Sequence, residues 1–460
     1  MADILHALNS HLPPECLHLS DEIRVQYSTD TSPEAPVLPL AVLTPTSEDQ
    51  VGLIVALSSQ YSTPIVIRGT GTGTTGGAIP VHNGLVLSFE KLNTILEIDT
   101  LNRVAVVQAG VLTGDLHKAV EAQQLFYPPD PASLSICTIG GNVAENAGGP
   151  RALKYGVTRD YVMGLEGFWA NGTPFKLGGK HYKNVAGYDL IRLLVGSEGT
   201  LAIITRITLK LLPLPKFYQD LMISFDTISS AVHWLSSLHQ EALVPATAEL
   251  MDDRCVEAGE AYLGRAIPLP KAKAYVLVRL DSPYADSLER DRLLLTDRSK
   301  TLGACMVSVA QNRQEAQQWW ELRQALSPAL KHIGVEKVSH DIVVPPSEMG
   351  AFFEGLNHLR EESGYLILGY GHLGDGNIHV NILREAHALL DWSLQKRSLS
   401  DQIMALAVQL GGTITGEHGI GLTKKLYLPL VFSNHDLEIM RGIKRVFDPQ
   451  LLLNPGKGLP

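Results

Sequence analysis

Cysteine is scarce in this chain of 460 residues, which contains only four. Cys16, Cys137, Cys255 and Cys305 lie far apart and form no C-x-x-C pair. This spacing argues against an iron–sulfur cluster held by this chain's own thiolates, and equally against a disulfide framework. We therefore expect a protein of a reducing, cytoplasmic compartment.

Long apolar runs and an excess of basic residues are also missing. No run of about 18 apolar residues predicts a transmembrane helix, and the N-terminus lacks the pattern of a signal peptide. Attachment to the inner face of a membrane stays open. Acidic residues outnumber basic ones, 48 to 38, which leaves no basic footprint for nucleic acid and favours a small-molecule partner. The composition is that of a globular protein, and the length suggests two or three lobes.

Changes in pattern divide the chain into four segments. Residues 1–36 contain a short helix and a proline-rich approach, and residues 37–215 alternate strands and helices between glycine-rich stretches. Pro213 and Pro215 break this pattern. Residues 216–410 have longer helices between strand runs, and residues 411–460 regain glycine and proline.

Hydrophobic periodicity predicts individual elements within these segments. We expect helices at residues 4–12, 114–123, 229–238, 313–331 and 348–362, and strands at residues 64–67, 85–88, 104–108, 201–212 and 274–280.

Three glycine-rich stretches indicate a cofactor site. Residues 68–77 match neither the Walker loop nor the Rossmann fingerprint, and alone this stretch reads as a flexible turn. Residues 138–149 are dense in Gly, Ala and Asn, so their backbone could lie flat against a planar ring. Residues 196–200 form a third such stretch. Together the three suggest a large, flat, phosphate-bearing cofactor.

Two histidines flank an Asp-Gly pair, which is a hairpin signal. If Asp375 and Gly376 are the only turn residues, His372 directly faces His379 and both imidazoles could reach one metal ion. A different loop length would change this register. Two histidines alone are equally consistent with a hydrogen-bonded pair in the core.

A third metal ligand is available in the glycine-flanked pair Glu417-His418. Such side chains build a core poorly but can be presented to a ligand on a closely packed backbone. Two histidines and one carboxylate would hold zinc, manganese or ferrous iron, and would leave positions open for substrate oxygen atoms.

The order and spacing of these motifs resemble the vanillyl-alcohol oxidase/p-cresol methylhydroxylase flavoprotein superfamily. Within it, the chain resembles the FAD-linked D-2-hydroxyacid dehydrogenase family, which includes D-lactate dehydrogenases and the flavin subunit of glycolate oxidase. The family pattern H-x-G-D-x-N-x-H falls on residues 372–379, G-E-H-G-I-G-x-x-K on residues 416–424, an aromatic-x-L-R element on residues 320–323, and N-P-x-K on residues 454–457.

The resemblance implies an α+β fold. A two-part FAD-binding domain of the p-cresol methylhydroxylase type would comprise residues 37–215 and the returning residues 411–460. An α+β cap domain for the substrate, with an antiparallel sheet, would comprise residues 216–410. FAD would be non-covalent, since Thr72 stands where covalent members often carry a histidine.

The resemblance also implies the site residues. The implied FAD contacts are Arg68, Gly69, Thr70, Gly71, Thr72, Gly73, Pro129, Asp130, Ser133, Thr138, Gly141, Asn142, Asn146, Gly148, Gly149, Tyr155, Glu198, Gly199, Ile203 and Asn454. The implied substrate contacts are Arg323, Lys424, Tyr370 and Asn381, the implied base is His418, and the implied ligands of a divalent metal are His372, His379 and Glu417.

The expected reaction is the oxidation of a small 2-hydroxy acid, D-lactate or glycolate, to the 2-oxo acid. Ser339 stands where some members that prefer a longer diacid carry lysine, which disfavours 2-hydroxyglutarate. The alternative is the flavin subunit of a glycolate oxidase that is inactive without electron-transfer partners, including an iron–sulfur protein. A silent scaffold subunit and a zinc hydrolase account for fewer of the motifs.

His340 is expected at the surface and Cys137 in a buried position. The electron acceptor, the metal and a homodimeric state stay open.

Overall fold

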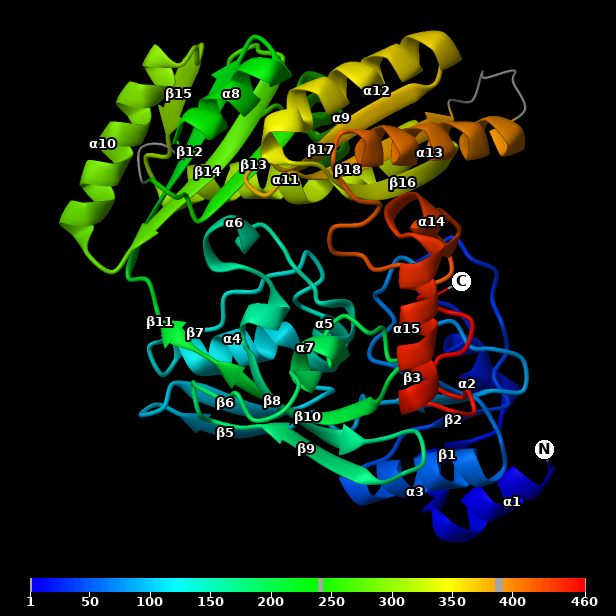
Figure 1. Cartoon of the computed structure of the whole chain (residues 1–460). Helices are drawn as coiled ribbons and strands as arrows, with labels where there is room; N and C mark the ends of the chain where they lie inside the picture. The colour runs from blue at the N-terminus through cyan, green and yellow to red at the C-terminus, as the bar shows by residue number, and fades with distance from the viewer. Residues whose placement is uncertain (1, 239–242, 385–391, 460) are drawn as a thin grey trace. The chain divides into compact units, whose positions relative to one another are not determined.

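The computed structural model describes residues 2–238, 243–384 and 392–459 (Figure 1). The chain forms two compact units. The first unit comprises Met1–Gly148, Gly156–Leu214 and Glu417–Pro460, and the second comprises Gly149–Tyr155 and Pro215–Gly416. The chain thus passes between units after residues 148, 155, 214 and 416. The sequence analysis placed its boundaries after residues 215 and 410. Within the described residues, no helix has the length and apolar character needed to cross a bilayer.

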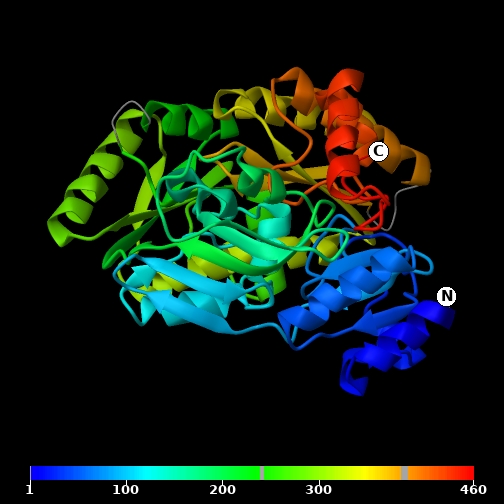
Figure 2. The same ribbon diagram turned by 60° about the horizontal axis from the view of Figure 1, so that its bottom comes forward.

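A small sheet in the first unit carries the first glycine-rich stretch. Its strands run in the order β1 (Leu17–His18), β2 (Ala41–Leu43), β4 (Leu85–Ser88) and β3 (Ile65–Arg68), and the last three are parallel. Every residue of β2 and β4 is buried, as expected of parallel strands covered on both faces. Helices α1 (Ala2–His11) and α3 (Glu48–Gln60) pack together here (Figure 2).

An antiparallel sheet of five strands forms the rest of this unit's framework. Its order is β5 (Ile95–Asp99), β6 (Val104–Gln108), β10 (Ile203–Lys210), β8 (Val162–Phe168) and β9 (Pro174–Gly178). Both sheets share one apolar core. The unit's other elements are η1 (Pro14–Cys16), α2 (Asp21–Gln26), α4 (Thr113–Glu121), β7 (Leu125–Phe126), α5 (Ile139–Glu145), η2 (Thr158–Asp160), α7 (Leu190–Leu194), β11 (Leu212–Pro213), η5 (Lys425–Tyr427), α14 (Leu428–Val431) and α15 (Asn434–Phe447).

The last residues of the chain complete the edge of the small sheet. The N–H of Ile65 donates to Leu452 O, and the N–H of Asn454 donates to Ile65 O, at 2.8 Å each. Leu453 thereby pairs with Ile65 in a parallel bridge beside β3. The strand that leads into residues 68–77 is therefore held on one side by residues nearly 400 positions further on.

An antiparallel sheet of seven strands is the framework of the second unit (Figure 1). Its order is β15 (Met306–Val309), β12 (Phe217–Phe225), β14 (Ala274–Ser282), β13 (Thr247–Asp252), β17 (Leu366–His372), β18 (Asn377–Arg384) and β16 (Glu336–Val343). Helices α9 (Asp253–Leu263) and α11 (Arg313–Ile333) pack together and contact the sheet. The remaining elements are α6 (Ala152–Tyr155), α8 (Ile228–Leu238), α10 (Ala285–Thr301), η4 (Pro346–Glu348), α12 (Met349–Ser363) and α13 (Trp392–Gln409).

Two local predictions were wrong. Residues 139–145 form helix α5 and not a flat loop, because the Thr138 side chain caps the helix by accepting from the Gly141 N–H at 3.1 Å. The hairpin between β17 and β18 has four loop residues and not two, so His372 faces Asn377, and Tyr370 faces His379.

Candidate active site

The first glycine-rich stretch leaves the end of β3 as a loop rich in free backbone donors. Within the described part of the chain, the N–H groups of residues 70–76 donate to no protein acceptor. Gly71 and Gly76 have φ angles of +75° and +86°, which few other residues adopt. The Thr70 hydroxyl anchors the loop by donating to Ile136 O at 2.7 Å. Such a row of N–H groups fits the phosphates of a dinucleotide.

Helix α5 lies against this loop. A side-chain carbon on Gly69 would collide with the Thr138 hydroxyl, so the contact between loop and helix depends on the missing side chain. The Asn142 amide donates to Thr113 Oγ1 at 2.8 Å, and the Asn146 carbonyl Oδ1 accepts from the Arg159 N–H at 2.9 Å. Both asparagines implied as FAD contacts thus also hold the helix in place.

A pair of buried carboxyl groups lies beside these loops. Glu145 is at the end of α5, and its Oε2 is buried with no hydrogen-bond partner in the described ranges. Burial, and then the neighbouring Glu198 and Asp30, raise the pKa of Glu145 well above its ordinary value. Burial also raises the pKa of Glu198, although its oxygens accept from the N–H groups of Ile420 and Gly421 at 2.8 and 2.7 Å. An unpartnered, protonated carboxyl can donate to a polar cofactor, so this feature also fits FAD.

Replacing Glu145 by glutamine is expected to flatten the pH dependence of stability. Between the ordinary glutamate pKa near 4.5 and the raised folded value, the folded protein binds more protons than the unfolded chain, so its stability falls as pH rises. In this pH range the free energy of unfolding of the wild type should fall by up to ~1.4 kcal/mol per pH unit because of Glu145. The Glu145→Gln variant should not show this fall. Calorimetric unfolding of the FAD-free protein between pH 4.5 and 8 measures this difference. The exposed Glu121→Gln variant is the matched control, and parallel curves for wild type and Glu145→Gln would contradict the prediction.

The other implied FAD contacts occupy varied places. Arg68 is buried, donates to Thr29 O at 2.6 Å and lies over the Tyr27 ring. Ile203 is a core residue of β10. The Asn454 amide donates to Gly77 O and Glu198 O at 3.2 and 2.7 Å. Thr72 and Gly73 lie in the first loop, Pro129, Asp130 and Ser133 precede α5, Gly148 follows it, and Gly199 lies in the turn before β10.

Two of the implied FAD contacts, Gly149 and Tyr155, belong to the second unit. The Tyr155 hydroxyl donates to Asp281 Oδ2 at 2.7 Å. Lys154 also pairs with Asp281, so this short segment is tied to the end of β14.

His372 and His379 lie on one face of the second unit's sheet, although the predicted register was wrong. Tyr370 faces His379, and His372 lies two residues along from Tyr370, so the two histidines are diagonal neighbours. Their ring centroids are 5.3 Å apart and the rings are nearly perpendicular. Asn381 lies two residues beyond His379 on the same face, but it pairs with Leu368 and not with Tyr370.

Glu249 of β13 is a buried carboxylate that sequence analysis missed. Its Oε1 accepts from His372 Nδ1 at 2.7 Å, and its Oε2 forms an ion pair with Arg323 Nη2 at 2.6 Å. Burial alone would raise the pKa of Glu249, but His372 and Arg323 outweigh burial and lower it. The only available signal was an acidic residue inside the apolar run of residues 246–251, since a buried charge needs a partner.

Arg323 lies within this cluster on α11. Its guanidinium carbon is 4.8 Å from the centre of the Tyr370 ring, and burial raises the pKa of that tyrosine. Its Nε is buried and has no hydrogen-bond partner among the residues that the structure describes. A buried guanidinium with one unsatisfied N–H is suited to receive a carboxylate.

Asp341 of β16, also missed from the sequence, anchors the chain where it leaves the second unit. Its Oδ2 accepts from the Gly416 N–H at 2.8 Å and from the Thr415 hydroxyl at 3.0 Å, and its Oδ1 accepts from the Asn377 amide at 2.6 Å. Glu417 and His418 follow this anchored Gly416 directly in the sequence.

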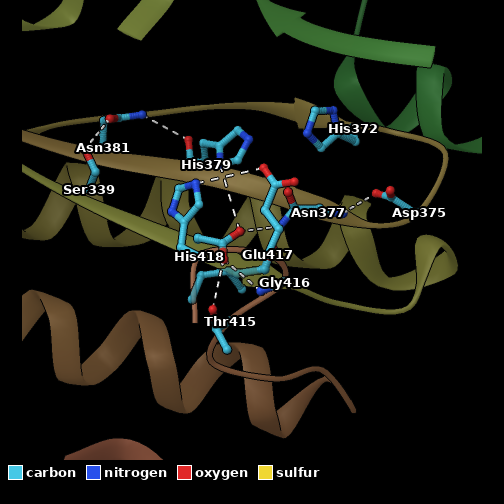
Figure 3. A network of polar contacts seen from close by, with 12 residues as sticks. Ser339, His372, Asp375, Asn377, His379, Asn381, Thr415, Gly416, Glu417 and His418 are labelled. Atoms are coloured by element: carbon cyan, nitrogen blue, oxygen red, sulfur yellow. Dashed lines mark hydrogen bonds and ion pairs between the residues drawn. The ribbon is translucent and has the colours of Figure 1, made fainter. Parts of the chain in front are cut away.

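Figure 3 draws these anchors together with Glu417, His418 and the two histidines. Ligand atoms of His372, His379 and Glu417 all lie within 4.8 Å of one another, and so do those of Asp341, His379 and His418. The first set offers two imidazoles and one carboxylate, which fits a divalent metal. The second set uses Asp341, whose two oxygens already accept three hydrogen bonds.

The remaining predicted residues are engaged with the protein. Asn381 accepts from the Ser339 hydroxyl at 2.8 Å and donates to His379 O at 3.0 Å. Lys424 is buried in the first unit, where its charge acts on Glu198. His340 was expected at the surface but is buried. Because side chains alternate along a strand, His340 lies on the face of β16 opposite to its neighbour Asp341, and there its Nε2 is 2.8 Å from the Ser400 hydroxyl of α13.

Two family models match the chain. The model described as an FAD binding domain matches residues 39–178, and the model described as the C-terminal domain of FAD linked oxidases matches residues 214–458. The glycolate oxidase subunit GlcD of Bacillus subtilis (strain 168) is 40% identical over 444 residues, which cover 96% of this chain and 94% of the relative. A D-lactate dehydrogenase of Archaeoglobus fulgidus is 38% identical over 416 residues, 90% of each chain. A D-2-hydroxyglutarate dehydrogenase of Xanthomonas citri pv. viticola is 34% identical over 427 residues, which cover 91% of this chain and 89% of the relative.

Solved structures confirm the predicted fold class. p-Cresol methylhydroxylase with substrate bound superposes with a TM-score of 0.79 at 16% identity, covering 100% of this chain and 96% of that one. An alkyldihydroxyacetonephosphate synthase gives 0.77 at 18% identity, covering 99% and 85%. On the sequence matches the chain belongs to the FAD-linked oxidase family, with the α+β fold of the vanillyl-alcohol oxidase/p-cresol methylhydroxylase superfamily.

Proposed function

We propose that this protein oxidises a small 2-hydroxy acid, D-lactate or glycolate, to the 2-oxo acid, using non-covalent FAD and a divalent metal. The observation that carries the proposal is the buried Arg323, whose Nε lacks a partner, in one cluster with His372 and Tyr370. The relatives named as glycolate oxidase subunit and D-lactate dehydrogenase support the reaction class.

Arg323 would bind the substrate carboxylate. Its free Nε–H is one donor, and the ion pair with Glu249 and the Tyr370 ring fix the plane of the guanidinium. Lys424, the second cation that sequence analysis suggested for the substrate, is buried near Glu198 in the first unit, so Arg323 is the better-supported carboxylate ligand.

His418 would accept the proton of the substrate hydroxyl. Its side chain is 35% exposed, and its Nε2 is 3.9 Å from Glu417 Oε1. The Thr75 hydroxyl donates to the His418 carbonyl at 3.2 Å, and the Thr75 carbonyl accepts from the Leu422 N–H at 2.7 Å, so the backbone on both sides of the imidazole is held. An imidazole titrates close to neutral pH and suits this role.

The metal would be held by His372, His379 and Glu417. A divalent cation on these ligands would lower the pKa of a coordinated hydroxyl. Bound FAD would supply the two-electron acceptor for the α-hydrogen, which leaves as hydride. The free N–H groups of residues 70–76 and the buried Glu145 carboxyl are the features of this chain that would bind it.

The substrate would be small. Ser339, at the position where a cation would favour a longer diacid, donates its hydroxyl to Asn381. No cationic side chain stands at that position to bind a second carboxylate, which favours glycolate or D-lactate over D-2-hydroxyglutarate. The alternative is that the chain is the flavin subunit of a glycolate oxidase and turns over only with its partner subunits, as the name of the GlcD relative suggests.

Anaerobic mixing with separate 2-hydroxy acids tests the proposal. The purified, FAD-loaded protein is mixed with glycolate, D-lactate, L-lactate or D-2-hydroxyglutarate, and the flavin absorption band is followed. We expect glycolate or D-lactate to bleach the band fastest, and L-lactate to be slower than D-lactate. Bleaching without turnover on an artificial electron acceptor would favour the multi-subunit alternative. A flavin band that none of the four acids bleaches would contradict the proposed reaction.

A further inference from the structure

Glu249 connects the two halves of the proposed substrate site. It is fully buried in β13, directly opposite His372 of β17. One of its oxygens accepts from His372 Nδ1, and the other is paired with Arg323 Nη2. A single carboxylate therefore contacts both the proposed metal ligand and the proposed ligand of the substrate carboxylate.

The first contact determines which nitrogen of His372 can bind a metal. Because Nδ1–H donates to Glu249, the proton of the neutral imidazole is on Nδ1, and Nε2 keeps its lone pair. A carboxylate that accepts from a metal-bound histidine also makes the imidazole a stronger ligand. Glu249 thus prepares His372 for a cation that Glu249 itself does not bind.

The second contact makes Glu249 sensitive to the state of Arg323. The guanidinium shares its positive charge with Glu249 through Nη2, while its buried Nε has no partner. A carboxylate bound at Nε would share the positive charge of the guanidinium with Glu249, so Arg323 would neutralise less of the negative charge on Glu249. Glu249 would then hold more negative charge toward His372, whose Nε2 would bind a cation more tightly.

We propose that Glu249 is a positioning residue that couples the binding of the metal to the binding of the substrate carboxylate. The inference rests on the proposed function and deepens it, since it adds a dependence between two ligands. Coupling of this kind is reciprocal, so metal should favour the carboxylate as much as the carboxylate favours the metal.

The test measures Zn²⁺ affinity with and without propionate, a carboxylate that lacks the reactive hydroxyl. Metal-stripped, FAD-loaded protein is titrated with Zn²⁺ against a chelating dye. In the wild type we expect propionate to tighten Zn²⁺ binding by roughly 5-fold or more. The Glu249→Gln variant should bind Zn²⁺ roughly 10- to 100-fold more weakly and show no response to propionate.

Two further variants make the result specific. Asp220→Asn removes another buried carboxylate of this unit, which pairs with Arg279 at 2.8 and 2.9 Å and accepts from Trp320 Nε1 at 3.0 Å. Among the described residues it has no histidine partner, so this variant should keep both the Zn²⁺ affinity and the propionate response. Arg323→Gln keeps the contact between Glu249 and His372, so it should bind Zn²⁺ but lose the response. The Arg323→Gln variant also tests the proposed coupling if Glu249→Gln does not fold.

The outcomes separate the inference from the function on which it rests. Equal Zn²⁺ affinity and equal propionate response in wild type and Glu249→Gln would overturn the coupling and leave the metal site intact. A propionate response that persists in Arg323→Gln would overturn it as well, because the carboxylate would then act on the metal directly. A wild type that binds no stoichiometric Zn²⁺ would overturn the proposed metal site, and the coupling with it.

Discussion

Replacing Glu417 by glutamine is expected to give a protein that keeps FAD but loses its metal and its activity. Glutamine has nearly the shape of glutamate but lacks the negative charge that completes a site of two imidazoles and one carboxylate. A metal ion lowers the activation free energy of such a reaction by several kcal/mol, so without it flavin reduction by the best substrate should slow by on the order of 10³-fold. Metal analysis, the flavin spectrum and anaerobic reduction kinetics measure the three properties separately.

The matched control for this variant is Glu438→Gln, an exposed carboxylate on α15 that should change none of the three properties. Full metal content in Glu417→Gln would show that the ligand set is wrong. The other local set, Asp341, His379 and His418, would then take its place. Loss of FAD together with the metal would contradict the expectation that FAD binds without the metal.

The second large effect is expected for His418→Asn, which should keep both FAD and metal but reduce flavin slowly. Asparagine retains a hydrogen-bonding side chain but cannot accept a proton near neutral pH. General base catalysis contributes roughly 10²- to 10⁴-fold, so the reduction rate should fall within that range. Stopped-flow reduction under anaerobic conditions is the measurement, and added imidazole should restore part of the rate.

His435→Asn provides the comparison, because it makes the same change at an exposed histidine of α15 and should leave the rate unaltered. If His418→Asn reduces flavin at the wild-type rate with metal bound, the proton is accepted elsewhere. If its metal is lost as well, His418 acts as a ligand and not as the base.

The histidine pair shows which parts of the site were predictable. The predicted register depended on a two-residue turn, but the loop has four residues. In this loop the Asp375 side chain accepts from the Asn377 N–H at 3.1 Å, and Gly376 alone has a positive φ. This moves the partner of His372 by two positions, from 379 to 377. Because side chains alternate along a strand, a shift of two keeps both histidines on one face, whereas a shift of one would have separated them.

Other features depended on contacts that are distant in sequence. The long helix α11 and strand β4 could be predicted, since their apolar spacing or β-branched content is local. Glu249 and Asp341 could not be assigned roles, because their partners lie 36 to 123 positions further along the chain. Helix α5 was missed because its glycines favour a loop, while the cap from Thr138 is a single side-chain contact.

The parallel bridge between Leu453 and Ile65 has a consequence for biosynthesis. Residues 215–416 form the second unit almost by themselves, so a ribosome releases nearly everything that unit needs before the first unit is complete. The first unit cannot be completed before residues 417–454 are synthesised, because these residues complete the edge of its small sheet and donate a backbone N–H to Glu198. We therefore expect a chain truncated after residue 416 to contain a folded second unit once it has left the ribosome, and to have no capacity to retain flavin.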